Sequence, residues 1–362
     1  MASDRPQLGF GSGVVVRIAV VCPYAFDAHG GVQDQVERLV RWLGEEGHEA
    51  WAVAPGSGGP PGTRTVGAWR SVPGNRARAP IAVDPRAVRR VAEAVADADV
   101  VHVHEPFMPM VSLGALLAET PPVVATFHAD PGKVGRRLYR LARPLMRRVA
   151  GRIAVATAVS RVAASAITGV PRVRIIPNGI DLDRFDPEAL AIPGRVLFIG
   201  RDEPRKGLDV LLQAWPRILR DVPGATLRVV GSERDSGPVG VTFLGRLGAE
   251  EKAIELGRCQ VLVAPNLGGE SFGLVVLEGL AAGRAVVASA LPAFAAVAGD
   301  SAVLVPPHDP VVLARAVADL LVDPAAARRL GDRAAARAAA FGRETVLGAY
   351  IAAYRDAMAH SG

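Results

Sequence analysis

Two series of short, predominantly apolar runs divide this chain of 362 residues, and stretches with helical periodicity separate most of them. A run without alternating polar residues is typical of a strand covered on both faces, as in a parallel sheet. The first series comprises residues 14–22, 48–55, 100–104, 123–128, 153–160 and 173–177. The second comprises 195–201, 225–231, 241–245, 261–265, 285–289 and 302–306. The pattern predicts two doubly wound α/β domains.

A turn-rich segment, 178–194, separates the two series and contains the pair Asn178-Gly179. Ligands of open parallel sheets bind beyond the carboxyl ends of the strands. Two such sheets therefore predict a site in a cleft between the domains, with closure about the 178–194 link because each half supplies only part of it.

Composition excludes several other classes of protein. The longest uncharged apolar run, 285–299, is broken by Pro292 and is shorter than the roughly 20 residues that a spanning helix needs. Arg17 interrupts the apolar run that follows the N-terminus, so no signal peptide is expected. Cys22 and Cys259 offer neither a disulfide framework nor a metal-binding spacing, which favours a reducing, cytosolic setting.

The net charge of +6 comes entirely from the first half of the chain. Two basic helical stretches, 83–90 and 135–152, fit docking on an anionic lipid surface. Nucleic-acid binding would need base-stacking aromatics, which make up only 5% of the residues, so no nucleic-acid partner is expected. A merely solvated basic face remains the alternative.

The stretch GGESFGLVVLEGLAAG, residues 268–283, carries two carboxylates, Glu270 and Glu278. The run after Ser271 predicts a helix that ends at Gly283. Eight residues at the helical rise span about 12 Å, more than the roughly 5 to 9.5 Å between paired glycosidase carboxyls. The pair therefore fits two contacts along one long ligand, such as a nucleotide sugar. The alternative is a helix-capping Glu270 and a solvated Glu278.

Two cations follow the strand predicted at 195–201. Arg201 ends the run and Lys206 lies in the loop beyond it. The chain has only three lysines, Lys133, Lys206 and Lys252, so a lysine in a motif is informative. Fixed cations at a strand end suit a diphosphate leaving group, on which charge builds as the sugar bond breaks. A solvated loop is the alternative.

The loops of the first series offer weaker signals. Gly30-Gly31 precedes a helix, where backbone N–H groups can approach an anion, but GxGxxG is absent and hydride transfer is disfavoured. His102 and His104 share one strand face but lack a third metal ligand. His128, at the end of its run, is the better candidate for the site.

GRDEPRKG and GGESFGLVVLEGLAAG together resemble the retaining glycosyltransferases of family 4, which have the GT-B fold. CPYAFDAHGGVQ, VHVHEP, TFH and IPNGID are similar to motifs of the bacterial phosphatidylinositol mannosyltransferases. The resemblance covers almost the whole chain. It implies two facing Rossmann-like domains: an acceptor domain over 14–181, completed by 345–362 crossing back, and a nucleotide-sugar domain over 188–344.

The resemblance implies retaining transfer of mannose from GDP-mannose to phosphatidylinositol or a similar inositol-phosphate lipid. Arg201 and Lys206 would hold the diphosphate. Glu270 would contact the sugar hydroxyls and Glu278 the ribose. Backbone N–H groups would complete the anion site, contributed by Gly31, Ser271, Phe272, Gly273 and Leu274. The implied catalytic group comprises His128, Arg201, Lys206 and Glu270, with His128 lining the sugar and acceptor pocket.

For the acceptor, the resemblance implies Tyr24, Asp27, Gln33 and Asn75 on the inositol side and Lys133 at the acceptor phosphate. One departure affects this assignment. The family has a Tyr-Asn pair in the loop that matches SVPGNRARAP, whereas here Gly74 precedes Asn75.

The implied partners are GDP-mannose and an anionic membrane surface, with the protein on the inner face of the cell membrane as a monomer or weak dimer. No metal held by protein ligands is implied, and Mg²⁺ would come with the nucleotide diphosphate if at all. Two alternatives remain open. One is a family 4 enzyme that uses a UDP-sugar, glucose or N-acetylglucosamine, with a soluble acceptor. The other is a sugar-nucleotide binder without catalysis.

Overall fold

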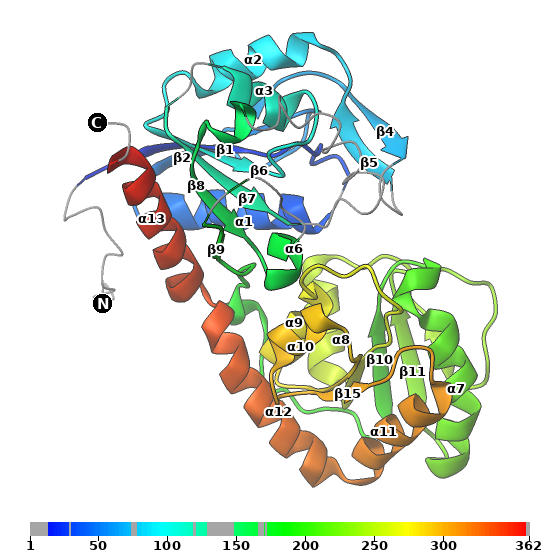
Figure 1. Cartoon of the computed structure of the whole chain (residues 1–362). Helices are drawn as coiled ribbons and strands as arrows, with labels where there is room; N and C mark the ends of the chain where they lie inside the picture. The colour runs from blue at the N-terminus through cyan, green and yellow to red at the C-terminus, as the bar shows by residue number, and fades with distance from the viewer. Residues whose placement is uncertain are drawn as a thin grey trace. The chain divides into compact units, whose positions relative to one another are not determined.

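Figure 1 shows the computed structural model of the chain, which describes residues 14–359 except 29, 74–77, 119–120, 129–147, 166–169 and 171. The chain forms two compact units, residues 1–179 with 343–362, and residues 180–342. The corresponding domains predicted from the sequence are 14–181 with 345–362, and 188–344. Among the described residues, no helix has both the length and the apolar character needed to cross a bilayer.

A seven-stranded parallel sheet forms the centre of the first unit, in the order β3-β2-β1-β6-β7-β8-β9. Its strands are β1 (Arg17–Val21), β2 (Glu49–Ala54), β3 (Arg64–Thr65), β6 (Val100–His104), β7 (Val123–Phe127), β8 (Ile153–Ala158) and β9 (Arg174–Ile175). The predicted first strand began at residue 14. Val14 and Val15 instead lie exposed before β1, so that part of the prediction was wrong.

Helices cover both faces of this sheet, as its uninterrupted apolar strands require. Among the described residues, these helices are α1 (Gly31–Glu45), α2 (Arg86–Val95), α3 (Val111–Leu117), α6 (Arg161–Ser165) and α13 (Arg343–Ala359). Ile18 and Val20 of β1 pack in one core with α1 and α13, whereas Ala19 and Val21 pack in another with α2 and α3. Strands β4 (Trp69–Pro73) and β5 (Arg78–Ala82) form a separate antiparallel hairpin, and Ala82 of β5 packs in the second of these cores.

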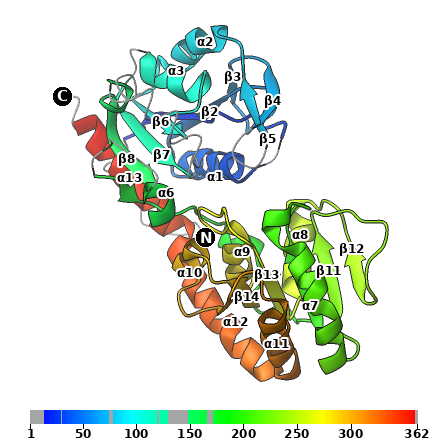
Figure 2. The same cartoon turned by 45° about the vertical axis from the view of Figure 1, so that its right-hand side comes forward.

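The second unit contains a six-stranded parallel sheet in the order β12-β11-β10-β13-β14-β15. Its strands are β10 (Arg195–Ile199), β11 (Thr226–Val230), β12 (Val241–Phe243), β13 (Val261–Ala264), β14 (Ala285–Ser289) and β15 (Val303–Val305). The helices are α7 (Leu208–Asp221), α8 (Ala249–Arg258), α9 (Leu274–Ala281), α10 (Pro292–Ala298), α11 (Pro310–Val322) and α12 (Pro324–Ala338). Figure 2 shows α7 beside α11, and their apolar side chains share one core with the sheet.

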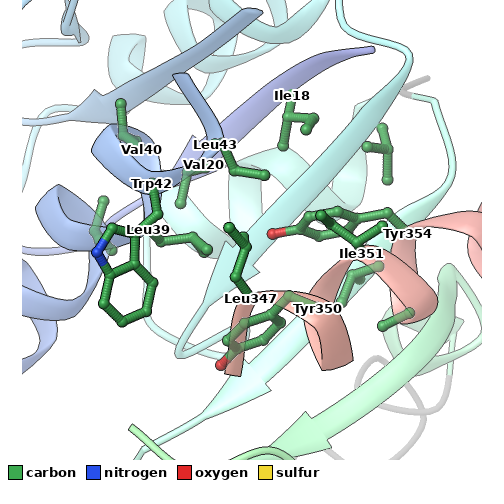
Figure 3. Close-up of a cluster of buried hydrophobic side chains, with 14 of the residues drawn as sticks. Ile18, Val20, Leu39, Val40, Trp42, Leu43, Leu347, Tyr350, Ile351 and Tyr354 are labelled. Atoms are coloured by element: carbon green, nitrogen blue, oxygen red, sulfur yellow. The ribbon is translucent and has the colours of Figure 1, made fainter. Parts of the chain in front are cut away.

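The helix α13 returns the chain to the first unit, as the resemblance implied. Tyr350 and Tyr354 are buried against α1 and the sheet (Figure 3). Val346 is buried in the same core, whereas Ala349 is only partly buried. Arg343, the first residue of α13, forms ion pairs with Glu45 at 2.5 Å and with Glu46 at 2.7 Å. These ion pairs connect α13 to the end of α1. The first unit is therefore built from two separate stretches of the chain.

Candidate functional site

Three donors converge on one carboxylate oxygen in the second unit. Glu270 Oε1 accepts from Lys206 Nζ at 2.7 Å, from Arg205 Nη1 at 2.9 Å and from Asn266 Nδ2 at 2.7 Å. The side chains of Arg205, Lys206 and Glu270 are at most 20% exposed. In the described part of the chain, the other oxygen of Glu270 has no hydrogen bond. That oxygen is available to accept from a ligand hydroxyl.

A close backbone approach brings these residues together. Gly207 follows Lys206 with φ +73°, and a Cβ there would lie 1.9 Å from the carbonyl oxygen of Pro265. In addition, Leu267 N donates to Arg205 O at 2.8 Å. The loop after β10 therefore lies directly against the loop after β13, which places Lys206 beside Glu270. Only glycine combines this conformation with this proximity.

Glu278 is held separately, on α9. Its Oε1 accepts from Lys252 Nζ of α8 at 2.6 Å, and its side chain is 19% exposed. The N-cap of α9 is Gly273, so Glu270 does not cap this helix, and Glu278 is ion-paired rather than solvated. Both parts of the alternative considered for this pair were wrong. The distance of about 12 Å expected between the two carboxylates was also wrong in its basis, because it assumed that both residues lie on one helix. Glu270 lies in the loop before α9.

Arg201 is the most exposed of the predicted phosphate ligands. Its side chain is 64% exposed, and its Nε lies 3.2 Å from Glu203 Oε1. Glu203 in turn contacts Arg205 Nε at 2.8 Å through its other oxygen. Cations and carboxylates thus alternate along a row of contacts, with three positive charges against two negative ones. The row runs through Arg201, Glu203, Arg205, Glu270 and Lys206. Asp202 of the same loop is paired with Arg234 at 2.7 Å, so this row keeps one unbalanced positive charge for an anionic ligand.

The helix α9 begins at Leu274, directly after Gly273, whose φ is +107°. The first N–H groups of a helix lack intrahelical acceptors and can bind an anion. A Cβ at Gly273 would lie 2.6 Å from the Phe294 ring, so glycine permits the close packing of this turn. Phe272 is buried and contacts Phe341 edge-on, with ring centroids 6.0 Å apart. Only the backbone of Phe272 is therefore available for a ligand.

In the first unit, two of the predicted acceptor residues support their own loop. Gln33 donates its amide to the carbonyl oxygens of Ala25 at 3.1 Å and Ala28 at 2.6 Å, and it is buried. Asp27 accepts from Ser57 Oγ at 2.8 Å and Ser57 N at 3.0 Å, and these hydrogen bonds lower the pKa of its carboxyl. Both side chains hold the loop that leads to Gly31 at the start of α1.

The remaining predicted acceptor residues are less informative. Tyr24 forms an isolated antiparallel bridge with Ile81 of β5 and is partly buried. Asn75 and Lys133 lie outside the described residues, as does most of the basic stretch 135–152.

His128 follows β7 and is buried among other imidazoles. Its Nε2 lies 2.7 Å from His104 Nδ1, and its backbone N donates to Glu105 Oε1 at 3.0 Å. The rings of His102 and His104 lie on the same strand face, with centroids 4.3 Å apart, as the period of two predicted. Burial lowers the pKa of His102 and of His128 to about 3, since it penalises the imidazolium form.

These shifts predict acid sensitivity. In the unfolded chain a histidine titrates near pH 6.5, so between about pH 6.5 and pH 3 the unfolded state binds more protons than the folded state. The stability that the buried neutral histidines contribute is complete above that window and is lost as the pH falls through it. We expect the free energy of urea unfolding to fall between about pH 6.5 and pH 5, by up to about 1.4 kcal/mol per pH unit for each such histidine. His128→Gln should flatten this slope, and an unchanged slope would contradict the prediction.

Candidate metal ligands and the two cysteines can be located among the described residues. Within the described ranges, no group of three or more His, Cys, Asp or Glu side chains is arranged to hold a metal ion. Cys22 and Cys259 are buried and unbridged, and burial raises the pKa of each thiol to about 12.

The structure adds Arg205, Asn266 and Lys252 to the site. None of them was predicted, although the rarity of lysine already singled out Lys252. Arg205 and Asn266 gave no comparable signal, because their roles arise from the contact between two loops.

Comparison with known proteins gives consistent matches. Residues 29–184 match a family described as Glycosyltransferase Family 4, and residues 193–323 one described as Glycosyl transferases group 1. The chain is 39% identical over 331 residues to a phosphatidyl-myo-inositol mannosyltransferase of Mycolicibacterium smegmatis, covering 85% of each protein.

Two further matches are more distant. A D-inositol 3-phosphate glycosyltransferase of Streptomyces avermitilis is 34% identical over 220 residues, 52% of this chain and 47% of that protein. Among solved structures, a sucrose-phosphate synthase of Thermosynechococcus elongatus superposes with a TM-score of 0.74 at 23% identity, over 95% of this chain and all of that one.

Proposed function

The chain belongs to the GT-B glycosyltransferases of family 4, and on that basis we propose that it transfers mannose from GDP-mannose to an inositol-phosphate lipid such as phosphatidylinositol, with retention of configuration. The observation that carries the proposal is the Glu270 cluster, since its cations and open carboxylate oxygen suit a sugar diphosphate. The name of the mycobacterial relative supports the sugar and the acceptor.

We assign the donor to the second unit. Lys206 and Arg201 bind the diphosphate and stabilise the charge that builds on it as the sugar bond breaks. The open Oε2 of Glu270 accepts from a sugar hydroxyl, while its Oε1 stays bound to Arg205, Lys206 and Asn266. Glu278, oriented by Lys252, accepts from the ribose hydroxyls.

We assign the acceptor to the first unit. His128 borders the acceptor and sugar pocket, and the loop held by Asp27 and Gln33 forms a wall of it. Because these two side chains are engaged within the protein, they shape the pocket more than they contact the inositol. Lys133 remains our candidate for the acceptor phosphate.

The transfer is tested by mixing the enzyme with GDP-mannose and phosphatidylinositol vesicles and following GDP release. We expect release that depends on the lipid, and a mannosyl lipid as product. Matched reactions replace GDP-mannose by UDP-glucose or UDP-N-acetylglucosamine, and the lipid by soluble inositol 3-phosphate. Nucleotide binding without turnover in every reaction would mean a sugar-nucleotide binder.

One observation favours a second candidate, a transferase with a soluble acceptor. The relative from Streptomyces avermitilis is named for D-inositol 3-phosphate, which shares the phosphorylated inositol but lacks the lipid. Faster turnover with inositol 3-phosphate than with vesicles would favour this candidate. It would leave the donor assignment intact.

We also propose peripheral binding to the inner face of the cell membrane, through α2. Ala87, Val91 and Val95 are buried, which leaves Arg86, Arg89 and Arg90 exposed on the other side of the helix. An arginine near an anionic bilayer contributes about 1 kcal/mol. The three together are enough for a salt-sensitive attachment.

Replacing Arg86, Arg89 and Arg90 by glutamine should weaken binding to anionic vesicles roughly 100-fold in low salt. Vesicle flotation or sedimentation measures the change. The matched control replaces three exposed arginines of the second unit, Arg315, Arg329 and Arg333, which gives the same net charge. If both triple variants lose affinity equally, net charge rather than α2 governs binding.

A further inference from the structure

A buried chain of hydrogen bonds joins α13 to the central strands of the first unit. Tyr354 Oη lies 2.8 Å from His102 Nδ1, and His102 Nε2 lies 2.7 Å from Thr126 Oγ1. Thr126 Oγ1 lies 2.6 Å from Thr157 Oγ1, which donates to Ala125 O at 3.3 Å. All four side chains are buried.

The groups at the two ends of this series of hydrogen bonds determine which atom donates in each of them. Ala125 O can only accept, so Thr157 donates to it, Thr126 donates to Thr157, and His102 donates from Nε2 to Thr126. His102 Nδ1 then accepts from the Tyr354 hydroxyl. In the reverse direction, the described residues would leave the buried Tyr354 proton without an acceptor. His102 is therefore neutral with both nitrogens engaged, and it contacts His104 only through its ring face.

The pair His104 and His128 is constrained by a different feature. One nitrogen of this pair donates and the other accepts across the 2.7 Å contact. Within the described part of the chain, His104 Nε2 is buried without a hydrogen-bond partner. A buried N–H without an acceptor is rarer than an unused lone pair, so the proton of His104 belongs on Nδ1. His104 then donates to His128 Nε2, and His128 must carry its proton on Nδ1.

Both residues are also fixed through the backbone. Ser112 Oγ donates to His104 O at 2.7 Å, and Glu105 accepts from His128 N at 3.0 Å. Glu105 does so from a left-handed backbone conformation, with φ +46°, an uncommon geometry for a residue other than glycine. The end of β6 thus holds His128 at its ring and at its main chain.

We propose that His104 is a positioning residue that fixes His128 as the Nδ1–H tautomer, so that His128 presents a neutral hydrogen-bond donor to an oxygen of the transferred sugar or of the acceptor. The identity of that oxygen rests on the proposed function, whereas the tautomer does not. The low pKa of His128 agrees with this role, because the ring stays uncharged at neutral pH. In this tautomer Nδ1 has no lone pair, and His128 does not take the proton of the acceptor hydroxyl.

Two substitutions of His104 separate positioning from packing. His104→Phe keeps a flat ring between His102 and His128 but removes the donor. His104→Asn places an amide N–H where Nδ1 lies and can still donate to His128 Nε2. We expect His104→Phe to lower kcat roughly 10- to 100-fold with little change in the KM for the donor. His104→Asn should restore most of the loss. Wild-type kcat in His104→Phe, or equal losses in the two variants, would overturn the proposal.

A spectroscopic test needs no substrate. Nitrogen-15 NMR of the histidine-labelled full chain distinguishes a protonated ring nitrogen from an unprotonated one, and His128→Gln identifies the signals of His128. We expect its Nδ1 to be protonated and its Nε2 unprotonated near neutral pH, and the opposite pattern would overturn the proposal. If wild-type protein shows no sugar transfer, the proposed function fails, while the NMR result still decides the tautomer.

Discussion

Replacing Lys206 by alanine is expected to lower kcat for sugar transfer roughly 100- to 1000-fold, about 3 kcal/mol of transition-state stabilisation. The ammonium faces a diphosphate whose charge grows as the sugar leaves, so the loss should exceed any loss of donor affinity. Glu270 Oε1 would still accept from Arg205 and Asn266, so the carboxylate should keep its position. Arg201→Ala should act in the same direction, since Arg201 belongs to the same alternating row of charges.

Steady-state kinetics with varied donor concentration check this prediction, with donor binding measured separately by calorimetry. The control is Arg220→Ala, an exposed arginine of α7 that contacts its neighbour Asp221. It removes one positive charge from the same unit and should leave kcat unchanged. Near-normal kcat in Lys206→Ala would rule out the diphosphate assignment for this residue.

Replacing Gly207 by alanine is expected to destabilise the second unit by about 3 kcal/mol or more. The left-handed conformation with a Cβ costs about 1 kcal/mol, and the methyl group would overlap the Pro265 carbonyl at 1.9 Å. Relief requires the loops after β10 and β13 to separate. Their separation would also move Lys206 away from Glu270, so transfer activity should fall with stability.

Gly224→Ala separates these two effects. Gly224 has φ +91°, similar to Gly207, but a Cβ there would meet no atom within 4 Å. This variant should therefore lose only about 1 kcal/mol and keep full activity. Urea unfolding and kinetics of both variants give the comparison. Equal destabilisation of the two would mean that the close approach to Pro265 is unimportant.

The fold was accessible from the sequence because parallel strands buried on both faces leave uninterrupted apolar runs. The helix α9 was predicted for a similar reason, since Leu274, Leu277 and Leu280 recur at helical intervals before Gly283. The hairpin β4–β5 was missed. Its strands, WRSVP and RAPIA, are only five residues long and contain Pro73 and Pro80, and proline is uncommon inside strands.

The site was only partly accessible. Glu270 and Glu278 stand out because charged residues are rare in their surroundings, and Lys206 stands out because the chain has only three lysines. The partners of all three depend on contacts between distant segments. Arg205 is 65 residues from Glu270 in the chain, and a local pattern does not encode such a contact. For Gln33, by contrast, the sequence suggested a role that the structure does not support. Its position beside a glycine pair suggested a ligand contact, but its amide is engaged by backbone carbonyls of its own loop.

The dependence of the first unit on α13 has a consequence for biosynthesis. Domains generally fold as units while the chain emerges from the ribosome. The second unit is continuous, so it can fold as soon as residues 180–342 are available. The first unit cannot bury the face of its sheet around Ile18 and Val100 until Leu347, Tyr350 and Tyr354 have been translated. The half of the protein that is translated first is therefore the half that is completed last, and its unfinished core is exposed to chaperones and proteases throughout synthesis.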